Sequence, residues 1–147
     1  MKAAALKKVA TVGAVSATAV AGLVLGTTPA AAAPVNTQNF YVNYGNTYAK
    51  GELRWYNRTV RFDASLRALS GCKLFELSAT DGKGRWDRVA EFLCPGDIGS
   101  KRINGVLGFD NVRGGAKDVY ITIGNGDPLK RQHCNKFKTR CGAQHNV

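Results

Sequence analysis

Two histidines near the C-terminus bracket two cysteines, and these four side chains are the groups best suited to chemistry. His133 directly precedes Cys134, and His145 follows Cys141 by four residues. Two thiolates and two imidazoles suit a tetrahedral zinc ion, but this spacing matches no standard zinc finger. In an oxidising compartment such cysteines form a disulfide instead. We therefore expect neither a metal nor a cofactor.

The same histidines suggest acid–base catalysis on a phosphodiester as an alternative. Imidazoles exchange protons near neutral pH, and Lys136, Lys138 and Arg140 would hold the phosphate. The usual hydrolase triads are excluded, because residues 34–132 contain no histidine and the chain has no Gly-x-Ser-x-Gly motif. Without a recognisable catalytic constellation, we expect a protein that is not an enzyme.

The C-terminal segment offers better material for binding. After Asp127 the sequence has five lysines and arginines around one phenylalanine, and no acid. Such a cluster attracts nucleic acid, an anionic cell-wall polymer or an anionic membrane surface, although a loop that only keeps the protein soluble has the same composition. The candidate binding residues are Lys130, Arg131, Lys136, Phe137, Lys138 and Arg140.

Two further surfaces are weaker candidates. Arg54, Arg61 and Arg67 share the predicted outward face of a hairpin with Tyr56. Residues 36–48 interleave asparagines with aromatic residues, and aromatic faces beside amides can bind sugar rings. An edge strand with flexible turns explains the same composition.

The elements that position these residues follow an N-terminal leader. Lysines, an apolar stretch at residues 9–25 and a run of alanines are typical of a secretory signal peptide. The apolar stretch is shorter than the roughly 20 residues of a stable membrane anchor. We expect cleavage after Ala32, so that residues 1–32 are the signal peptide and residues 33–147 form one secreted, extracellular domain. Cleavage would lower the net charge from +11 to +8.

Apolar residues alternate with polar ones between residues 40 and 123, which predicts an all-β domain. The phase of this alternation changes at Asn57 and Arg58. A hairpin turn there would pair Trp55 with Val60, whereas a bulge in one continuous strand would also change the phase. We favour the hairpin, because a single strand would far exceed the usual length of about 5 or 6 residues.

The four cysteines allow three pairings, and sequence alone does not choose among them. Cys72 and Cys94 lie at equal distances from Lys83 in a turn-rich segment. A hairpin centred on that lysine would place the two cysteines opposite each other, near disulfide distance. We favour this pairing, which leaves Cys134 and Cys141 to close a short basic loop.

About seven short strands separated by turns favour a small, disulfide-stabilised antiparallel β-sandwich of the immunoglobulin-like kind over a closed barrel. The predicted strands are residues 40–44, 51–56, 59–67, 72–79, 86–94, 103–109 and 118–123.

The alanine-terminated leader, the segment Gly51 to Val60 (GELRWYNRTV) and the pair Gly71 and Cys72 carry a family resemblance. They resemble the small secreted proteins of unknown function that are abundant in actinomycetes. The resemblance covers the leader and about half of the mature chain, and implies an exported bacterial sandwich rather than an activity. Enediyne-binding apoproteins and the subtilisin- and amylase-inhibitor families are similar in size, but their motifs are absent here.

The sequence therefore predicts a secreted, non-enzymatic binding domain of unknown ligand that contacts an anionic partner through its basic C-terminal loop. One alternative is a cationic effector, either an antimicrobial protein or a nuclease-like toxin. Another is an inhibitor of an extracellular hydrolase, for which residues 96–101 or 134–141 would supply an exposed rigid loop.

Overall fold

The computed structural model describes residues 32–96, 100–125 and 129–147, and these contain nine antiparallel strands. The predicted signal peptide lies outside the described residues, except for Ala32. Within the described ranges, no helix is long and apolar enough to cross a membrane. The strands are β1 (Asn36–Tyr44), β2 (Thr47–Trp55), β3 (Thr59–Arg67), β4 (Lys73–Thr80), β5 (Trp86–Leu93), β6 (Lys101–Gly108), β7 (Asp118–Gly124), β8 (Lys130–Asn135) and β9 (His145–Asn146).

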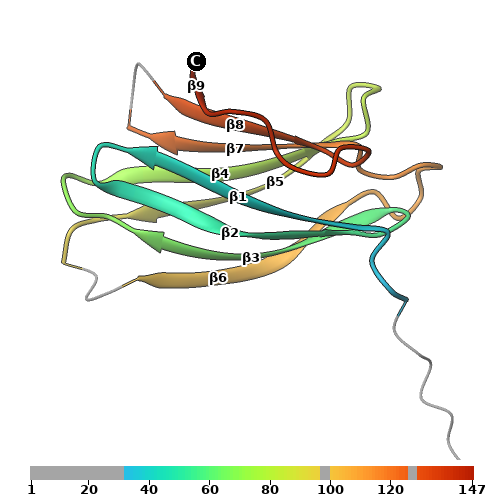
Figure 1. Ribbon diagram of the computed structural model, residues 1–147, viewed down its shortest axis with the longest axis horizontal. Helices are drawn as coiled ribbons and strands as arrows, with labels where there is room; N and C mark the ends of the chain where they lie inside the picture. Colours follow the sequence, from blue (N-terminus) through green and yellow to red (C-terminus); the bar gives the residue numbers. More distant parts are fainter. Residues whose placement is uncertain (1–31, 97–99, 126–128) are drawn as a thin grey trace, which may run out of the picture. The chain divides into compact units, whose positions relative to one another are not determined.

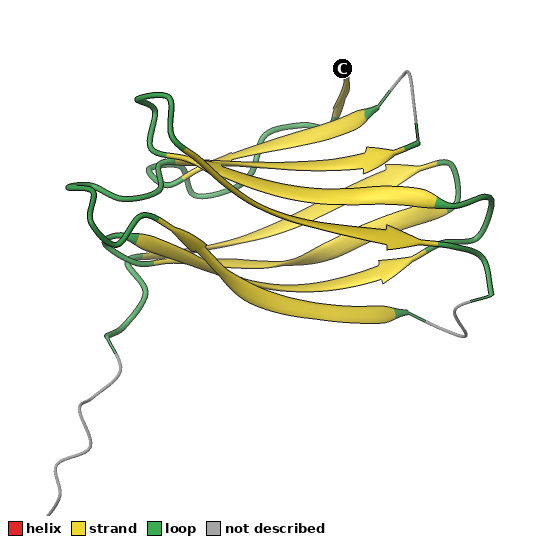
Figure 2. Ribbon diagram, turned by 180° about the vertical axis from the view of Figure 1, so that it is seen from behind, coloured by secondary structure: helices red, strands yellow, loops and turns green. Residues whose placement is uncertain are grey.

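The strands form two packed sheets (Figures 1 and 2). Sheet A has the order β1-β2-β3-β6, and sheet B has the order β5-β4-β7-β8-β9. The predicted all-β sandwich is confirmed. The predicted strand count was too low, because β8 and β9 were missed. Strand β8 has only one fully buried side chain, Cys134, so it lacks the alternation of polar and apolar residues that reveals a strand.

The predicted hairpin between β2 and β3 is confirmed, with Trp55 opposite Val60. The backbone N–H of Tyr56 donates to the carbonyl of Thr59 at 2.8 Å and closes the turn. This register directs the apolar residues of both strands into the core, where Trp55 is fully buried.

Both predicted disulfides, Cys72–Cys94 and Cys134–Cys141, are present. Strands β4 and β5 pair symmetrically about Lys83, so that the first pair of cysteines flanks the far end of the hairpin. The two bonds are compatible with an extracellular location.

The core lies between the sheets and is closely packed. The packing leaves no room for a side chain at position 105, where Gly105 on β6 lies opposite Phe62 on β3. A Cβ atom at this position would approach the Phe62 ring to 2.8 Å. The ring therefore occupies the space that a side chain at Gly105 would need.

Because successive strands run antiparallel, the connections β2–β3, β4–β5, β6–β7 and β8–β9 all leave the strands at one end of the sandwich (Figure 1). Backbone hydrogen bonds join the β2–β3, β6–β7 and β8–β9 connections, and the amide of Lys117 donates to the carbonyl of Thr80 at the end of β4. The amide of Ala116 donates to the carbonyl of Arg58 at 3.1 Å, and the amide of Lys136 donates to the carbonyl of Lys117 at 2.8 Å. This end of the molecule is thus one interlocked surface.

Candidate binding surface

The structure divides the predicted binding residues among three places. Lys130 and Arg131 belong to β8, where successive side chains point to opposite faces. Arg131 lies on the outer face of sheet B, and Lys130 donates to the side chain of Asn146. Lys136 donates from Nζ to the carbonyl of Asn57 at 2.9 Å, and burial lowers the pKa of its ammonium. The side chains of Phe137, Lys138 and Arg140 remain together in an exposed loop.

This loop is held in a fixed position by β1. The side-chain amide of Asn36 donates to the carbonyls of Lys136, at 2.8 Å, and Lys138, at 2.6 Å. The amide of Gln38 donates to the carbonyls of Asn135 and Lys138. Together with the disulfide that closes the loop, these bonds leave little freedom to the backbone beneath Phe137, whose exposed fraction is 76%.

Three other connections extend the basic surface beyond the C-terminal loop. They bring five further cations to the same end, and the only acids in the four connections are Asp81 and Asp110. None of the segments that join strands at the opposite end contains a lysine or an arginine. The cations of all four connections together make up a surface that we call the basic end. Its residues are Arg58, Lys83, Arg85, Arg113, Lys117, Lys136, Lys138 and Arg140.

The buried carboxylate of Asp81 shapes the connection that carries two of these cations. Its Oδ1 accepts from the backbone amides of Lys83, at 2.7 Å, and Arg85, at 3.2 Å. Burial acts to raise the pKa of Asp81, but the two hydrogen bonds and the nearby cations outweigh it and hold the pKa below its ordinary value. The carboxylate is therefore charged at neutral pH and fixes the turn.

The outer face of sheet B carries a second feature, a recess of about 530 Å³ near the basic end. Trp86 and Tyr120 form one wall, with ring centroids 5.7 Å apart, and His133 stacks on Tyr120 at 4.8 Å. The remaining lining residues are Glu76, Ser78, Arg88 and Arg131.

The structure separates the two histidines of the predicted acid–base pair. His133 lines a recess together with Lys138 and Arg140, whereas His145 lies elsewhere. His145 lies opposite Arg131 near the start of β8, whereas Lys136 follows the end of that strand, roughly 16 Å further along at about 3.3 Å per residue. His133 is hydrogen-bonded to the carboxylate of Asp118 at 2.7 Å. Within the described residues, no three histidine, cysteine, aspartate or glutamate side chains are grouped to hold a metal ion.

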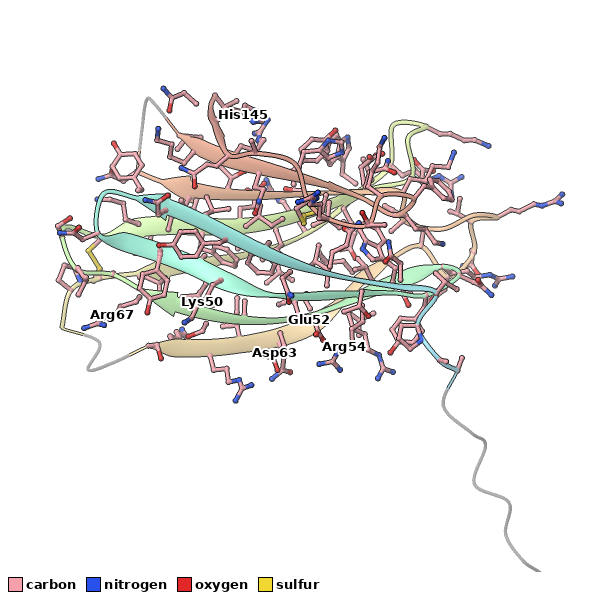
Figure 3. All side chains as sticks on the ribbon, in the orientation of Figure 1. Lys50, Glu52, Arg54, Asp63, Arg67 and His145 are labelled. Atoms are coloured by element: carbon pink, nitrogen blue, oxygen red, sulfur yellow. A yellow bond between two sulfur atoms is a disulfide. The ribbon has the colours of Figure 1, made fainter. Side chains whose placement is uncertain are left out.

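The outward arginines of the first hairpin are present on sheet A but differ in their surroundings (Figure 3). Arg54 pairs with Glu52, which raises the pKa of the guanidinium, and Arg61 lies 5.4 Å from the centroid of the Tyr56 ring. Arg67 is exposed at the opposite end from the basic end. This face mixes bases with acids, since Glu52 pairs with Arg54 and Asp63 pairs with Arg102.

No known protein family, curated protein or solved structure matches this chain. The likeness to small secreted actinomycete proteins therefore stays an interpretation of the leader and a few motifs.

Sequence reasoning missed the cations of the other three connections and the ring stack on sheet B. The first group was detectable in principle, since alternate connections of an antiparallel hairpin series leave the strands at the same end. The ring stack was not, because Trp86 and Tyr120 come from β5 and β7 and meet across β4, an order that the sequence does not reveal.

Proposed function

We propose that this protein is a secreted, non-enzymatic binding domain that holds an anionic polymer against its basic end. One observation carries the proposal: the four connections at this end contain eight cations and two acids, whereas the connections at the other end contain no cation and the strand ends beside them carry four, Arg67, Lys73, Lys101 and Lys130. A charge distribution of this kind attracts polyanions and orients them as they approach.

The arrangement favours an extended polymer over a small anion. The cations are spread over four separate connections and do not converge on one deep pocket, so a ligand must span several loops to reach them. The interlocking hydrogen bonds fix the loops before binding, which lowers the entropic cost of association. The leader and the two disulfides support an extracellular site of action.

The test uses the processed, oxidised protein recovered from the medium after expression of the full chain. Binding to long polygalacturonate and to a 30-nucleotide oligothymidylate is measured over a range of salt concentrations. We expect saturable binding that weakens steeply with salt, because polymer binding releases counterions. If neither polymer binds at low salt, the proposal is overturned.

Two double variants locate the surface. Lys138→Ala/Arg140→Ala removes exposed cations of the C-terminal loop, and Lys83→Ala/Arg113→Ala removes exposed cations of two other connections. Each should weaken binding about tenfold. Each should also make binding less dependent on salt, because about one counterion fewer is released for every cation that no longer pairs with the polymer.

The matched control is Lys50→Ala/Arg67→Ala, which removes the same charge from exposed positions on sheet A (Figure 3). It should bind almost as the wild type does. Equal weakening in the control and in both test variants would mean that net charge alone drives binding, and would contradict a defined surface.

The second candidate function is inhibition of an extracellular hydrolase, and it rests on Phe137. A rigid, disulfide-closed loop that projects a single aromatic side chain suits insertion into the cleft of another protein. Saturable inhibition of a secreted hydrolase that Phe137→Asp abolishes, and that persists at high salt, would favour this function over polymer binding.

A further inference from the structure

The recess on the outer face of sheet B has the size and lining of a ligand site. Its volume of about 530 Å³ lies within the range of about 300 to 1,000 Å³ that is usual for small-molecule sites. Its residues come from four strands of the sheet, so the site stands on the rigid part of the fold. None of its lining residues belongs to the basic end.

The aromatic wall is fixed by a chain of interactions that begins at Asp118. This carboxylate accepts a hydrogen bond from Asn135, at 2.7 Å, and is bonded to the ring of His133 at 2.7 Å. His133 stacks on Tyr120 with an interplanar angle of 12°, and Tyr120 also contacts the tilted ring of Trp86. Tyr120 contacts both of its neighbouring rings, whereas Trp86, with an exposed fraction of 59%, offers ring surface for a ligand.

Two arginines provide charge beside this wall. Arg131 lies 5.7 Å from the centroid of the Tyr120 ring, and its Nε donates to Thr122 at 3.2 Å, which orients the guanidinium. Arg88 lies 3.9 Å from Glu76 and is mostly exposed, so it is free to reorient toward a ligand. A guanidinium binds a planar carboxylate through two parallel hydrogen bonds.

The floor of the recess provides a hydrogen-bond acceptor. Glu76 accepts from the hydroxyl of Ser78 at 2.5 Å and keeps an exposed fraction of 27%. A carboxylate in this position suits the hydroxyl groups of a sugar, which donate hydrogen bonds. With two arginines and one glutamate, the lining still carries a net positive charge.

We propose that this recess binds a uronic acid unit of an acidic oligosaccharide. The sugar ring packs on Trp86, its hydroxyl groups donate to Glu76, and its carboxylate pairs with Arg131 and Arg88. A single-stranded nucleic acid fits less well, because base stacking needs successive open ring faces and the wall offers one. The recess shares no residue with the basic end, so this proposal does not depend on polymer binding there.

Intrinsic fluorescence gives a direct test, because the chain has only two tryptophans. Trp55 is buried and Trp86 is exposed, so acrylamide quenches chiefly Trp86. The processed protein is titrated with trigalacturonic acid, with galactotriose as the neutral analogue and with trithymidylate as the nucleotide analogue. We expect trigalacturonic acid alone to protect Trp86 from quenching, with saturation at millimolar concentration or below.

Variants connect this signal with the proposed interactions. Trp86→Phe should remove the fluorescence change while keeping weakened binding in calorimetry, and Arg131→Gln should weaken binding at least tenfold. The matched control is Arg61→Gln, since Arg61 lies over Tyr56 on sheet A with nearly the same geometry. A melting temperature near that of the wild type establishes that each variant is folded.

Three outcomes would overturn the proposal. Equal protection by galactotriose would show that the carboxylate is not recognised. Protection by trithymidylate without trigalacturonic acid would assign the recess to nucleic acid. Absence of protection by all three probes would show that the recess is not a site of this kind, and it would leave the polymer-binding result at the basic end unaffected.

Discussion

The side-chain amide of Gln144 forms two hydrogen bonds with the backbone of Asn43. Its Nε2 donates to the Asn43 carbonyl at 2.8 Å, and its Oε1 accepts from the Asn43 amide at 2.7 Å. Gln132 accepts from the amide of Tyr41 in a similar way at 3.0 Å. These amides present a donor and an acceptor where a neighbouring strand would, and so cover the free edge of β1 against pairing with another chain.

Gln144→Ala should expose this edge. We expect a decrease of about 1–2 kcal/mol in the free energy of unfolding, from two hydrogen bonds of ordinary strength. Hydrogen exchange of the Asn43 amide should become faster in the variant, as measured by NMR, while exchange in the centre of sheet B stays unchanged. Gln144→Glu keeps the acceptor and removes the donor, so its free energy of unfolding and its exchange rate at Asn43 should lie between those of the wild type and of Gln144→Ala. Unaltered exchange at Asn43 in Gln144→Ala would contradict the role of this side chain.

Gln38 links the buried indole of Trp55 to the C-terminal loop. Its Oε1 accepts from Trp55 Nε1 at 3.1 Å, and its amide donates to the carbonyls of Asn135 and Lys138. Gln38→Leu would leave the buried indole N–H without its acceptor, at a cost of about 1–3 kcal/mol in urea unfolding. Asn39→Ala, at the exposed neighbouring position, is the control and should unfold almost as the wild type does. If Gln38→Leu lowers the free energy of unfolding no more than Asn39→Ala does, the indole N–H has found another acceptor.

The two disulfides should contribute differently to stability and to binding. Their half-cystines are 22 and 7 residues apart, so the chain-entropy relation predicts about 3.4 kcal/mol for Cys72–Cys94 and about 2.5 kcal/mol for Cys134–Cys141. Replacing Cys134 and Cys141 by alanine should weaken polymer binding more than removal of Cys72–Cys94 does, because the Cys134–Cys141 bond closes the loop of Lys138 and Arg140. Calorimetric melting and polymer titration measure the two effects. Weaker binding after removal of Cys72–Cys94 than after removal of Cys134–Cys141 would contradict this assignment.

The parts of the fold that sequence predicted depend on short-range patterns. The turn at Asn57 and Arg58 follows from a change in the phase of alternation, and the first disulfide follows from the symmetry of its cysteines about Lys83. Both are properties of a single hairpin, in which the turn fixes the register.

The parts that sequence missed depend on the pairing of distant strands. Strand β8 is polar apart from Cys134, and it is a strand because β7 pairs with it along its length. The wall of Trp86 and Tyr120 forms across an intervening strand. Such long-range relationships leave no local pattern in the residues themselves.

Asp81→Asn tests how the connection between β4 and β5 is held. The wild-type carboxylate accepts from the amides of Lys83 and Arg85, and these bonds hold its pKa below the ordinary value. A carboxyl group whose pKa is lowered by folding stabilises the protein above its unfolded pKa, of about 4. That stabilisation is lost as the pH falls from there through the lower pKa of the folded state.

We therefore expect wild type to be more stable than Asp81→Asn at pH 7, and the difference to close as the pH falls from about 4 toward 2. Urea unfolding at a series of pH values measures this difference. Asp110→Asn is the control, because Asp110 is exposed at the same end of the sandwich. A difference between wild type and Asp81→Asn that stayed constant down to pH 2 would mean that the substitution acts through shape or packing and not through charge. The hydrogen bonds to Lys83 and Arg85 would then not depend on the ionised carboxylate.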